Sequence, residues 1–493
     1  MTEDYDLIII NGVVATPESS QALDIGIKDS KIKTLAAPGQ LKDSTAKRTI
    51  DAQGAYVTPG GVDAHVHLEE PPLFGKGSSA DTYETGSRSA ICGGTTTMIT
   101  FAPQQKSMDS LLSTLSTCHE KADRKCYVDY SFHLLVSNPS ATALAEFATL
   151  REKGISSLKI YMTYAALQLD DGQILDVLLE ARKQGITTMI HAENGAVIDW
   201  MTKKLEEKQL FAPKWHVTSH PPVAEVEATY RAISLAEFLD VPILIVHVSS
   251  PGAAKHIREA QGRGLPVYAE TCPQYLFLTR KDLDRDGFEG AKYCCSPPPR
   301  EGEADHEAIW RGLEDGTFTV LSSDHCPFLY DDAVTGKKRC ISDDFPVGHF
   351  KYVPNGLPGI ETRLPLAMSA SRLNICKFVE VTSTNAAKLY GLYPRKGTIL
   401  EEVSDADLVV WYPGGEMESF ELKNEMLHHA VDHTPYEGRT LSQWPRYTIL
   451  RGHVAWDRDN GGLIGGKDGV FLPRGPSSLK GSLSEREWDV RDF

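Results

Sequence analysis

Eight short apolar segments recur along the middle of the 493-residue chain, separated by stretches that read as amphipathic helices. Two clear helices are "DDGQILDVLLEARKQG" at 170–185 and "PPVAEVEATYRAISLAEFLD" at 221–240. Strands that alternate with helices form βαβ units and a parallel sheet, and eight units predict a TIM (β/α)8 barrel over 57–390. A doubly wound open sheet is the alternative, but no Gly-x-Gly-x-x-Gly follows the first strand. The expected strands are 61–67, 95–101, 127–135, 156–162, 186–192, 242–248, 265–271 and 319–325.

Both ends of the chain look different from this middle, with short strand-like runs separated by turn signals. Near the start, "LIII" is followed by Asn11-Gly12 and "VVAT", which is typical of a β-hairpin. Because chain termini often lie close together, we predict one small β-sandwich domain built from 1–56 and 391–475, followed by a polar tail at 476–493. Its later strand candidates are "DADLVVWYP" at 405–413, "YTILRGHVAW" at 447–456 and "GVFLP" at 469–473.

Composition narrows the class of protein. A hydrophobic content of 41% and a charged content of 24% are typical of a soluble globular chain. The net charge of -16 argues against nucleic acid and anionic membrane as partners, because both bind a basic face. The nine cysteines form no Cys-x-x-Cys pair, the first residues do not resemble a secretory signal, and no apolar run approaches the ~20 residues of a membrane span. We therefore expect reduced thiols and a cytoplasmic protein.

Polar side chains stand at the carboxyl ends of five predicted strands, which is the edge where TIM barrels carry out chemistry. Imidazole and carboxylate together suit a first-row divalent ion, and zinc is the commonest choice in hydrolases. A catalytic zinc usually keeps three protein ligands and an open position, so this larger set predicts two ions. The residues are His65 and His67 on the first strand, Lys159 on the fourth, His191 on the fifth, His247 on the sixth and Asp324 on the eighth.

Lys159 does not fit such a set as an ordinary lysine, because an ammonium beside two cations is repelled and offers no lone pair. One interpretation is that its side chain extends to solvent or pairs with a carboxylate. The other is that its surroundings make it neutral and that it has added carbon dioxide to become a carbamate. A carbamate would supply the bridging anion that two neighbouring dications require.

The motifs around these residues resemble those of the cyclic amidohydrolases, and most closely the dihydropyrimidinase and hydantoinase branch. They are "DAHVHLEEP", "SLKIYMTY", "IHAEN", "VHVSS" and "SSDHCPF", and segments such as "ETCPQYL", "SPPPR" and "NGLPGIETRLPL" extend the resemblance over nearly the whole chain. The resemblance implies a homotetramer that acts on a cyclic ureide or imide. It also implies two Zn²⁺ ions per chain, bridged by N6-carboxylysine at Lys159, with ligands His65, His67 and Asp324 for the more buried ion and His191 and His247 for the more exposed one.

By the same resemblance, a zinc-bound hydroxide would open the ring of 5,6-dihydrouracil or dihydrothymine to give an N-carbamoyl-β-amino acid. Asp324 would transfer the proton, and Tyr164 would donate a hydrogen bond to the tetrahedral oxyanion. Backbone groups at Ser296 and Asn355 would bind the –CO–NH–CO– unit. The alternatives are a hydantoinase, a cyclic imide hydrolase or an allantoinase. A non-catalytic scaffold is the remaining alternative, which the retained ligand set disfavours.

Some positions depart from the patterns of this superfamily. Dihydroorotases typically carry an arginine two residues past His-x-His, where this chain has Glu69, so we expect an anionic ring to be repelled. Lys76 and Arg88 are the cations that could reach the pocket and weaken this expectation. His220 in "TSHPP" stands where the branch usually has arginine.

Overall fold

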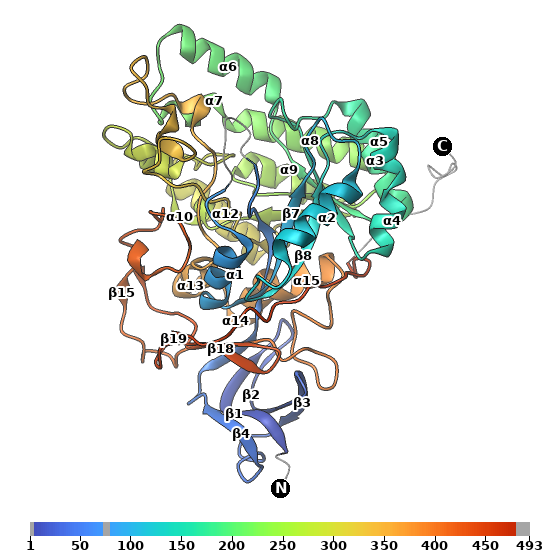
Figure 1. The fold of residues 1–493 in the computed structure, drawn as a ribbon, viewed down its shortest axis with the longest axis vertical. Coiled ribbons are helices and arrows are strands. Elements are labelled where there is room, and N and C mark those ends of the chain that lie inside the picture. Colours follow the sequence, from blue (N-terminus) through green and yellow to red (C-terminus); the bar gives the residue numbers. More distant parts are fainter. Residues whose placement is uncertain (1–3, 72–78, 480–493) are drawn as a thin grey trace.

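The computed structural model describes residues 4–71 and 79–479, and the middle of this chain forms an eight-stranded parallel sheet (Figure 1). Its order is β13-β12-β11-β10-β9-β8-β7-β6. A bridge between Val66 and His325 and a 2.8 Å hydrogen bond from the His67 amide to the His325 carbonyl join its two edges, so the sheet closes into the predicted TIM barrel. The strands are β6 (Gly61–Val66), β7 (Thr95–Pro103), β8 (Asp129–Leu135), β9 (Ser157–Tyr161), β10 (Thr187–His191), β11 (Ile243–Ile245), β12 (Val267–Thr271) and β13 (Val320–Leu321).

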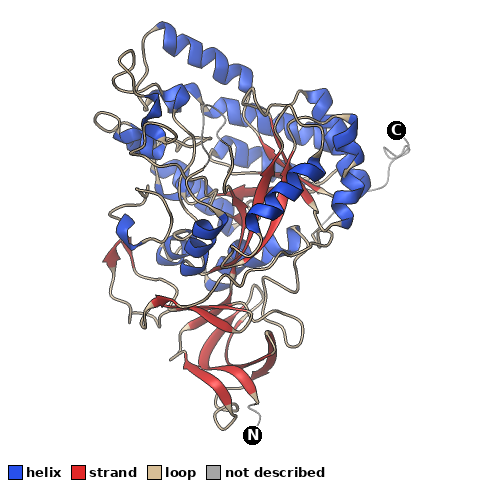
Figure 2. Cartoon of the chain, in the orientation of Figure 1, coloured by secondary structure: helices blue, strands red, loops and turns tan. Residues whose placement is uncertain are grey.

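Helices connect these strands and surround the sheet (Figure 2). The two helices read from the sequence are present as α5 (Asp171–Gln184) and α8 (Pro222–Leu239). Asp170 caps α5 through the Gln173 amide at 2.9 Å, and Gly185 ends it at φ 62°. The other long helices are α1 (Tyr83–Cys92), α2 (Leu111–Ala122), α6 (Gly195–Glu207), α9 (Pro251–Gly262) and α12 (Glu303–Glu314).

Short helices fill the longer connections of the barrel. The α-helical ones are α3 (Ala141–Ala145), α4 (Phe147–Glu152), α7 (Trp215–Ser219), α10 (Gln274–Phe277), α11 (Arg280–Leu283), α13 (Arg363–Ser369), α14 (Ile375–Val379) and α15 (Asn385–Leu389). The 3-10 turns are η1 (Glu289–Tyr293), η2 (Lys337–Cys340), η3 (Phe350–Tyr352) and η5 (Asn424–Met426), and η4 (Glu380–Thr384) is a π-helical turn. No helix among the described residues is long and apolar enough to cross a bilayer.

Strands from both ends of the chain form a second, nine-stranded sheet, which confirms the predicted β domain built from both termini. Figure 1 shows the blue and red strands together at the foot of the molecule. The order is β19-β18-β17-β14-β5-β1-β2-β3, with β4 paired to β1. The boundaries 1–56 and 391–475 stay predictions, and most of the expected tail lies outside the described residues. The strands are β1 (Tyr5–Ala15), β2 (Ser20–Lys28), β3 (Lys31–Ala36), β4 (Ala46–Asp51), β5 (Tyr56–Pro59), β14 (Leu408–Val410), β17 (Tyr447–Leu450), β18 (His453–Asp457) and β19 (Gly462–Leu463), while β15 (Phe420–Glu421) and β16 (Thr440–Leu441) form a separate pair.

Two local expectations in this domain are wrong. Asn11-Gly12 is not a hairpin turn but a bulge inside the continuous strand β1, where Asn11 has φ 57° and its amide binds Asp24 Oδ1 at 3.0 Å. Residues 469–473 do not join the β sheet. They run along β8 of the barrel instead, where the Leu472 amide donates a hydrogen bond to the Tyr130 carbonyl at 2.7 Å. The Phe471 ring packs against His119 of α2, with 4.5 Å between the ring centroids.

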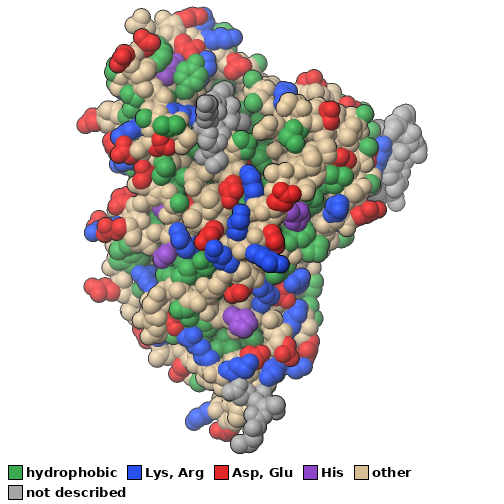
Figure 3. Space-filling model, viewed as in Figure 1, with side chains coloured by type: hydrophobic (Ala, Val, Ile, Leu, Met, Phe, Trp, Pro, Cys, Tyr) green, Lys and Arg blue, Asp and Glu red, His purple; other side chains and the backbone are tan. Residues whose placement is uncertain are grey.

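Acidic and basic side chains are interspersed over the face shown in Figure 3. A cluster of buried charge lies between the barrel and the β domain. There the Lys396 ammonium contacts Asp129 of β8 at 2.6 Å, and Asp407 and Asp405 just before β14 at 2.5 and 3.0 Å. Burial opposes the charge on Lys396, but the three carboxylates outweigh burial and raise its pKa above the usual value. This cluster therefore joins the two domains.

Replacing Lys396 with methionine should lower the midpoint of urea unfolding by an amount that corresponds to about 3–5 kcal/mol, because the buried Asp407 would lose its ion-pair partner and Asp129 and Asp405 would each lose one of theirs. The matched control is Lys31→Met, since Lys31 pairs with the same Asp405 at 2.7 Å but is 38% exposed. Its loss should cost at most about 1 kcal/mol. Equal midpoints for the two variants would show that Lys396 does not join the domains.

Candidate metal centre and active site

A cavity of about 660 Å³ opens at the carboxyl ends of the barrel strands. Most of the residues singled out in the sequence line it, and His65 lies fully buried behind this lining. The lining includes His67, Lys159, His191, His247, Asp324, Tyr164, Ser296 and Asn355. One cavity therefore brings together side chains from β6, β9, β10 and the loops that follow β11 and β13.

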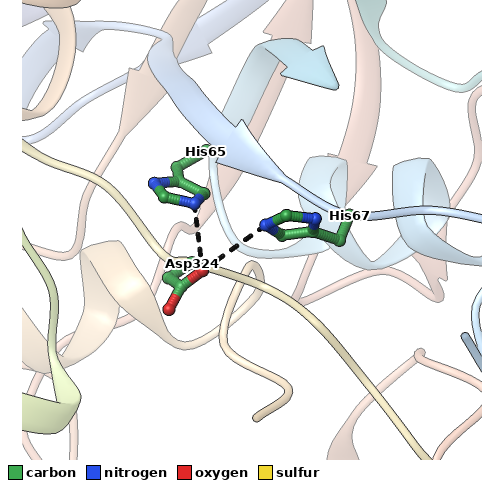
Figure 4. Close-up of side chains that lie close together, drawn as sticks. All are labelled: His65, His67 and Asp324. Carbon is green, nitrogen blue, oxygen red and sulfur yellow. Dashed lines mark ion pairs between the residues drawn. The ribbon is translucent and has the colours of Figure 1, made fainter. Parts of the chain in front are cut away.

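His65, His67 and Asp324 form the tightest group in this cavity (Figure 4). Asp324 Oδ1 lies 3.1 Å from His65 Nε2 and 3.7 Å from His67 Nε2. Burial lowers the pKa of His65, so its imidazole is neutral and keeps a lone pair. One ligand atom from each of the three residues lies within 4.8 Å of the others, and two nitrogens with one oxygen suit a first-row divalent ion. This group is a candidate metal site.

His191 and His247 form a second pair in the same cavity. His191 Nδ1 faces His247 Nε2 at 2.9 Å. Two ring nitrogens at this distance require either a shared proton or a cation between their lone pairs. The pair therefore also fits a metal ion by the chemistry of its donors.

Carboxylates lie behind three of the four histidines and determine which ring nitrogen faces the cavity. Each accepts the ring N–H on the side away from the centre, so the other nitrogen keeps its lone pair. This arrangement is typical of metal ligands, where such partners orient the imidazole. The pairs are His65 Nδ1 with Glu270 Oε1 at 2.6 Å, His67 Nδ1 with Glu70 Oε1 at 2.8 Å and His191 Nε2 with Glu193 Oε2 at 2.8 Å.

The orienting role of these carboxylates was not predicted from the sequence. Glu270 is the next-to-last residue of β12 and lies fully buried in an apolar run, "VYAET", which is a signal of the same kind that singled out the histidines. Glu193 follows His191 by two residues and is also fully buried. Burial raises the pKa of Glu270. A buried carboxyl of this kind needs a partner, and His65 provides it.

Lys159 is 1% exposed, so its side chain does not extend to solvent. Its Nζ lies 2.8 Å from His65 Nε2 and 4.4 and 4.9 Å from the ring centroids of Phe101 and Tyr161. Burial lowers the pKa of Lys159, and the carboxylates of Asp324 and Glu270 offset only part of this effect. A lysine in this environment is more easily neutral than one on the surface.

Backbone strain accompanies the side chains that enter the cavity. Tyr164, His247 and Asp324 have φ values of 66°, 39° and 51°, in the left-handed region that non-glycine residues rarely adopt. The expected strands 242–248 and 319–325 end earlier than predicted for this reason, at Ile245 and Leu321. Such strain is concentrated at functional sites.

Tyr164, Asn355 and Ser296 line the same cavity. Burial raises the pKa of Tyr164, so the phenol stays protonated and can donate a hydrogen bond. Its Oη accepts a hydrogen bond from Asn355 Nδ2 at 3.2 Å. The Ser296 hydroxyl donates to Glu193 Oε2 at 3.0 Å, which links the Ser296 loop to the carboxylate behind His191.

The residues that were expected to set the charge of the cavity lie elsewhere. Glu69 Oε1 accepts a 3.1 Å hydrogen bond from the amide of Tyr83, the first residue of α1. The neighbouring Glu70 lines the cavity instead. The Arg88 guanidinium donates to the His428 carbonyl at 2.9 Å. Lys76 lies outside the described residues. The expected repulsion of an anionic ring by Glu69 therefore loses its structural basis.

Comparisons with known proteins agree with this geometry. Residues 56–455 match the sequence profile described as the amidohydrolase family. A D-hydantoinase of Ralstonia pickettii is 39% identical over 474 residues, which cover 95% of this chain and 99% of that protein. A solved structure of D-hydantoinase superimposes with a TM-score of 0.89 at 38% identity, covering 96% of this chain and 100% of that one. The crystal structure of dihydropyrimidinase from Brevibacillus agri NCHU1002 gives 0.89 at 36% identity, with 96% and 99% covered.

Replacing Glu270 with glutamine should weaken metal binding by roughly 10- to 100-fold, because His65 loses the carboxyl group that orients it. Metal affinity is measured by competition with a coloured chelator. The control is Asp199→Asn, which changes a cavity-lining carboxylate. Equal affinities for Glu270→Gln and the unmodified chain would contradict the orienting role.

Proposed function

The chain belongs to the amidohydrolase family, in the branch of the hydantoinases and dihydropyrimidinases, and from this premise we propose that it opens the ring of 5,6-dihydrouracil and dihydrothymine. Membership of this branch makes it a cyclic amidohydrolase that acts on small cyclic ureides, as its resemblance implied. The products of the proposed reaction are N-carbamoyl-β-amino acids. The observation that supports it is the convergence of four histidines, Asp324, Lys159 and Tyr164 on one cavity.

In this proposal the site holds two Zn²⁺ ions. His65, His67 and Asp324 would hold one, His191 and His247 would hold the other, and N6-carboxylysine at Lys159 would bridge them. The buried, largely apolar surroundings of Lys159 favour the neutral amine that adds carbon dioxide. When bound, such ions supply water that is acidic enough to attack near neutral pH, and they polarise the scissile carbonyl.

The side chains of the chain itself account for proton transfer and for oxyanion stabilisation. Asp324 would accept the proton of the attacking water and deliver it to the amide nitrogen as the C–N bond breaks. Gln274 Nε2 donates to Asp324 Oδ2 at 3.2 Å, which leaves Oδ1 toward the histidines. The Tyr164 hydroxyl would donate to the tetrahedral oxyanion, and the backbone at Ser296 and Asn355 would orient the –CO–NH–CO– unit.

Hydantoins are the second substrate class, because the relatives that the chain matches include D-hydantoinases. Cyclic imides and allantoin remain alternatives of the same chemistry. A catalytically inactive scaffold is the alternative of another kind. The intact ligand set and the protonated Tyr164 in one cavity support an enzyme instead.

We also propose a homotetramer in the cytoplasm. Helices α6 and α8, labelled in the upper half of Figure 1, expose large apolar side chains. Trp200 is 59% exposed, Tyr230 58% and Phe238 56%, and burying such residues against another copy would remove apolar area from water. All nine cysteines are free, which supports a reducing compartment.

A hydrolysis panel tests the proposed function. The zinc-loaded chain should convert 5,6-dihydrouracil to N-carbamoyl-β-alanine and should also open hydantoin, with loss of activity after chelation and recovery with Zn²⁺. Ring loss is followed by chromatography for dihydrouracil, dihydrothymine, hydantoin, succinimide and allantoin. Turnover of succinimide or allantoin alone would replace the assignment with an alternative, and no turnover by a zinc-loaded chain would support the scaffold.

Replacing Tyr164 with phenylalanine should lower kcat by on the order of 10²–10³, because one donor to the oxyanion is lost. Metal content per chain should stay unchanged, since Tyr164 is not among the proposed ligands. Both quantities are measured on the same preparation. A variant that loses its metal, or one that keeps full kcat, would rule out this role.

A further inference from the structure

One cation in the wall of the cavity has no partner. Arg339 of η2 lines the cavity, and its Nη1 is buried without a hydrogen-bond partner. The guanidinium forms no ion pair with any carboxylate of residues 4–71 or 79–479. Burial lowers its pKa, and no carboxylate compensates for this effect. Arg339 therefore stands in the wall of the cavity with at least one donor nitrogen that has no acceptor among the described residues.

The other described cations that line the cavity are already engaged. Lys106 donates to the carbonyls of Ala165 and Gln168 at 3.1 and 3.2 Å. Lys351 pairs with Glu206 at 3.1 Å. Lys159 contacts His65 of the candidate metal site. Among the described cations of this lining, Arg339 is the one that has a buried donor nitrogen without a partner.

Buried arginine nitrogens elsewhere in the chain do not share this condition. Arg182 and Arg363 each have one buried nitrogen without a partner, but their remaining nitrogens donate to Asp240 and to backbone carbonyls. A buried donor that is left unsatisfied costs about 1–3 kcal/mol, and more when it is charged. This cost is recovered when an anion binds.

The position of Arg339 is held by its own loop. Lys337, two residues earlier, is fully buried, and its ammonium donates to the carbonyls of Pro354 and Gly356 at 3.0 Å each. These carbonyls lie on either side of Asn355, which the proposed function places at the substrate ring. The contacts of Lys337 thus anchor the backbone of the η2 turn beside the segment that would hold the ring.

We propose that Arg339 determines substrate preference by binding a carboxylate on the substituent of the ring. This inference rests on the proposed ring-opening function and adds a preference, among substituted cyclic ureides, for those with an anionic side group. Guanidinium and carboxylate match in geometry and form two parallel hydrogen bonds. A cavity of about 660 Å³ has room for such a substituent beyond a five- or six-membered ring.

The carboxylates near the cavity do not prevent this binding. Glu70 is engaged by His67 Nδ1 at 2.8 Å, and Glu69 faces α1. Asp199 of α6 also lines the cavity, but it is exposed, so water screens its charge. Phe350 and Val353 stand in the same lining and provide apolar contact for the methylene groups of a substituent.

A matched pair of substrates tests the inference. The ring is hydantoin in both, and the 5-substituent is 2-carboxyethyl in one and 2-carbamoylethyl in the other, so the two differ by one charge at nearly the same shape. The unmodified chain should have the higher kcat/KM for the carboxylate. In Arg339→Gln the ratio of the two kcat/KM values should fall by roughly 10- to 100-fold, which corresponds to one lost charged contact.

Two further variants complete the test. Arg339→Lys should keep part of the preference, because the charge remains and the two-pronged geometry is lost. Lys351→Gln is the matched control, and it should change the ratio by no more than about twofold, since that lysine is paired with Glu206 near the surface. In Arg339→Gln, kcat/KM for unsubstituted hydantoin should fall by much less than kcat/KM for the carboxylate substrate.

The outcomes separate this inference from the proposed function. If the unmodified chain opens no ring, charged or neutral, the proposed function itself is wrong. Activity on neutral rings with an unchanged ratio in Arg339→Gln overturns the inference alone. The same holds if that variant changes only inhibition by the carbamoyl product, because Arg339 would then bind the carboxylate that the reaction creates. If Arg339→Gln does not fold, a ratio of one or less in the unmodified chain overturns the inference.

Discussion

The hydrogen bonds between buried histidines and buried carboxylates determine what this cavity can bind. Glu270, Glu70 and Glu193 each hold the N–H of a histidine on the side away from the centre. The other ring nitrogens are therefore free to bind a cation that enters the cavity. The candidate metal site and the chemistry proposed for it both depend on this arrangement.

The sheet of the barrel provides stability, and the strained residues that follow its strands provide the functional side chains. Parallel pairing and apolar packing fix the directions of β6, β9 and β10, so ligands from distant parts of the chain meet at one rim. The last residues before the cavity leave the sheet, and His247 and Asp324 adopt left-handed backbone angles. The rigid barrel can tolerate this strain because its own hydrogen bonds do not depend on those residues.

Much of this arrangement follows from sequence patterns, because the patterns report local physics. Apolar runs at regular spacing predicted all eight barrel strands, and charged or imidazole groups inside such runs predicted the candidate metal ligands. The other predicted cavity residues, Tyr164, Ser296 and Asn355, came from the resemblance to a known family. The bulge at Asn11 was not predicted, because Asn-Gly is compatible with a hairpin turn and also with a β-bulge. The path of residues 469–473 was not predicted, because a short apolar run does not indicate which sheet it contacts. The position of Arg339 in the cavity wall was not predicted either. The partners of a loop cation depend on contacts that no spacing rule describes.

Anomalous diffraction from crystals of the zinc-loaded chain, recorded on both sides of the zinc absorption edge, tests the central claim most directly. We predict two anomalous peaks per chain. One lies at the Nε2 atoms of His65 and His67 and at Asp324, the other lies at His191 and His247, and continuous density beyond Lys159 Nζ reaches both. A single peak elsewhere, or a Lys159 side chain that ends at its Nζ beside two occupied sites, would contradict the account.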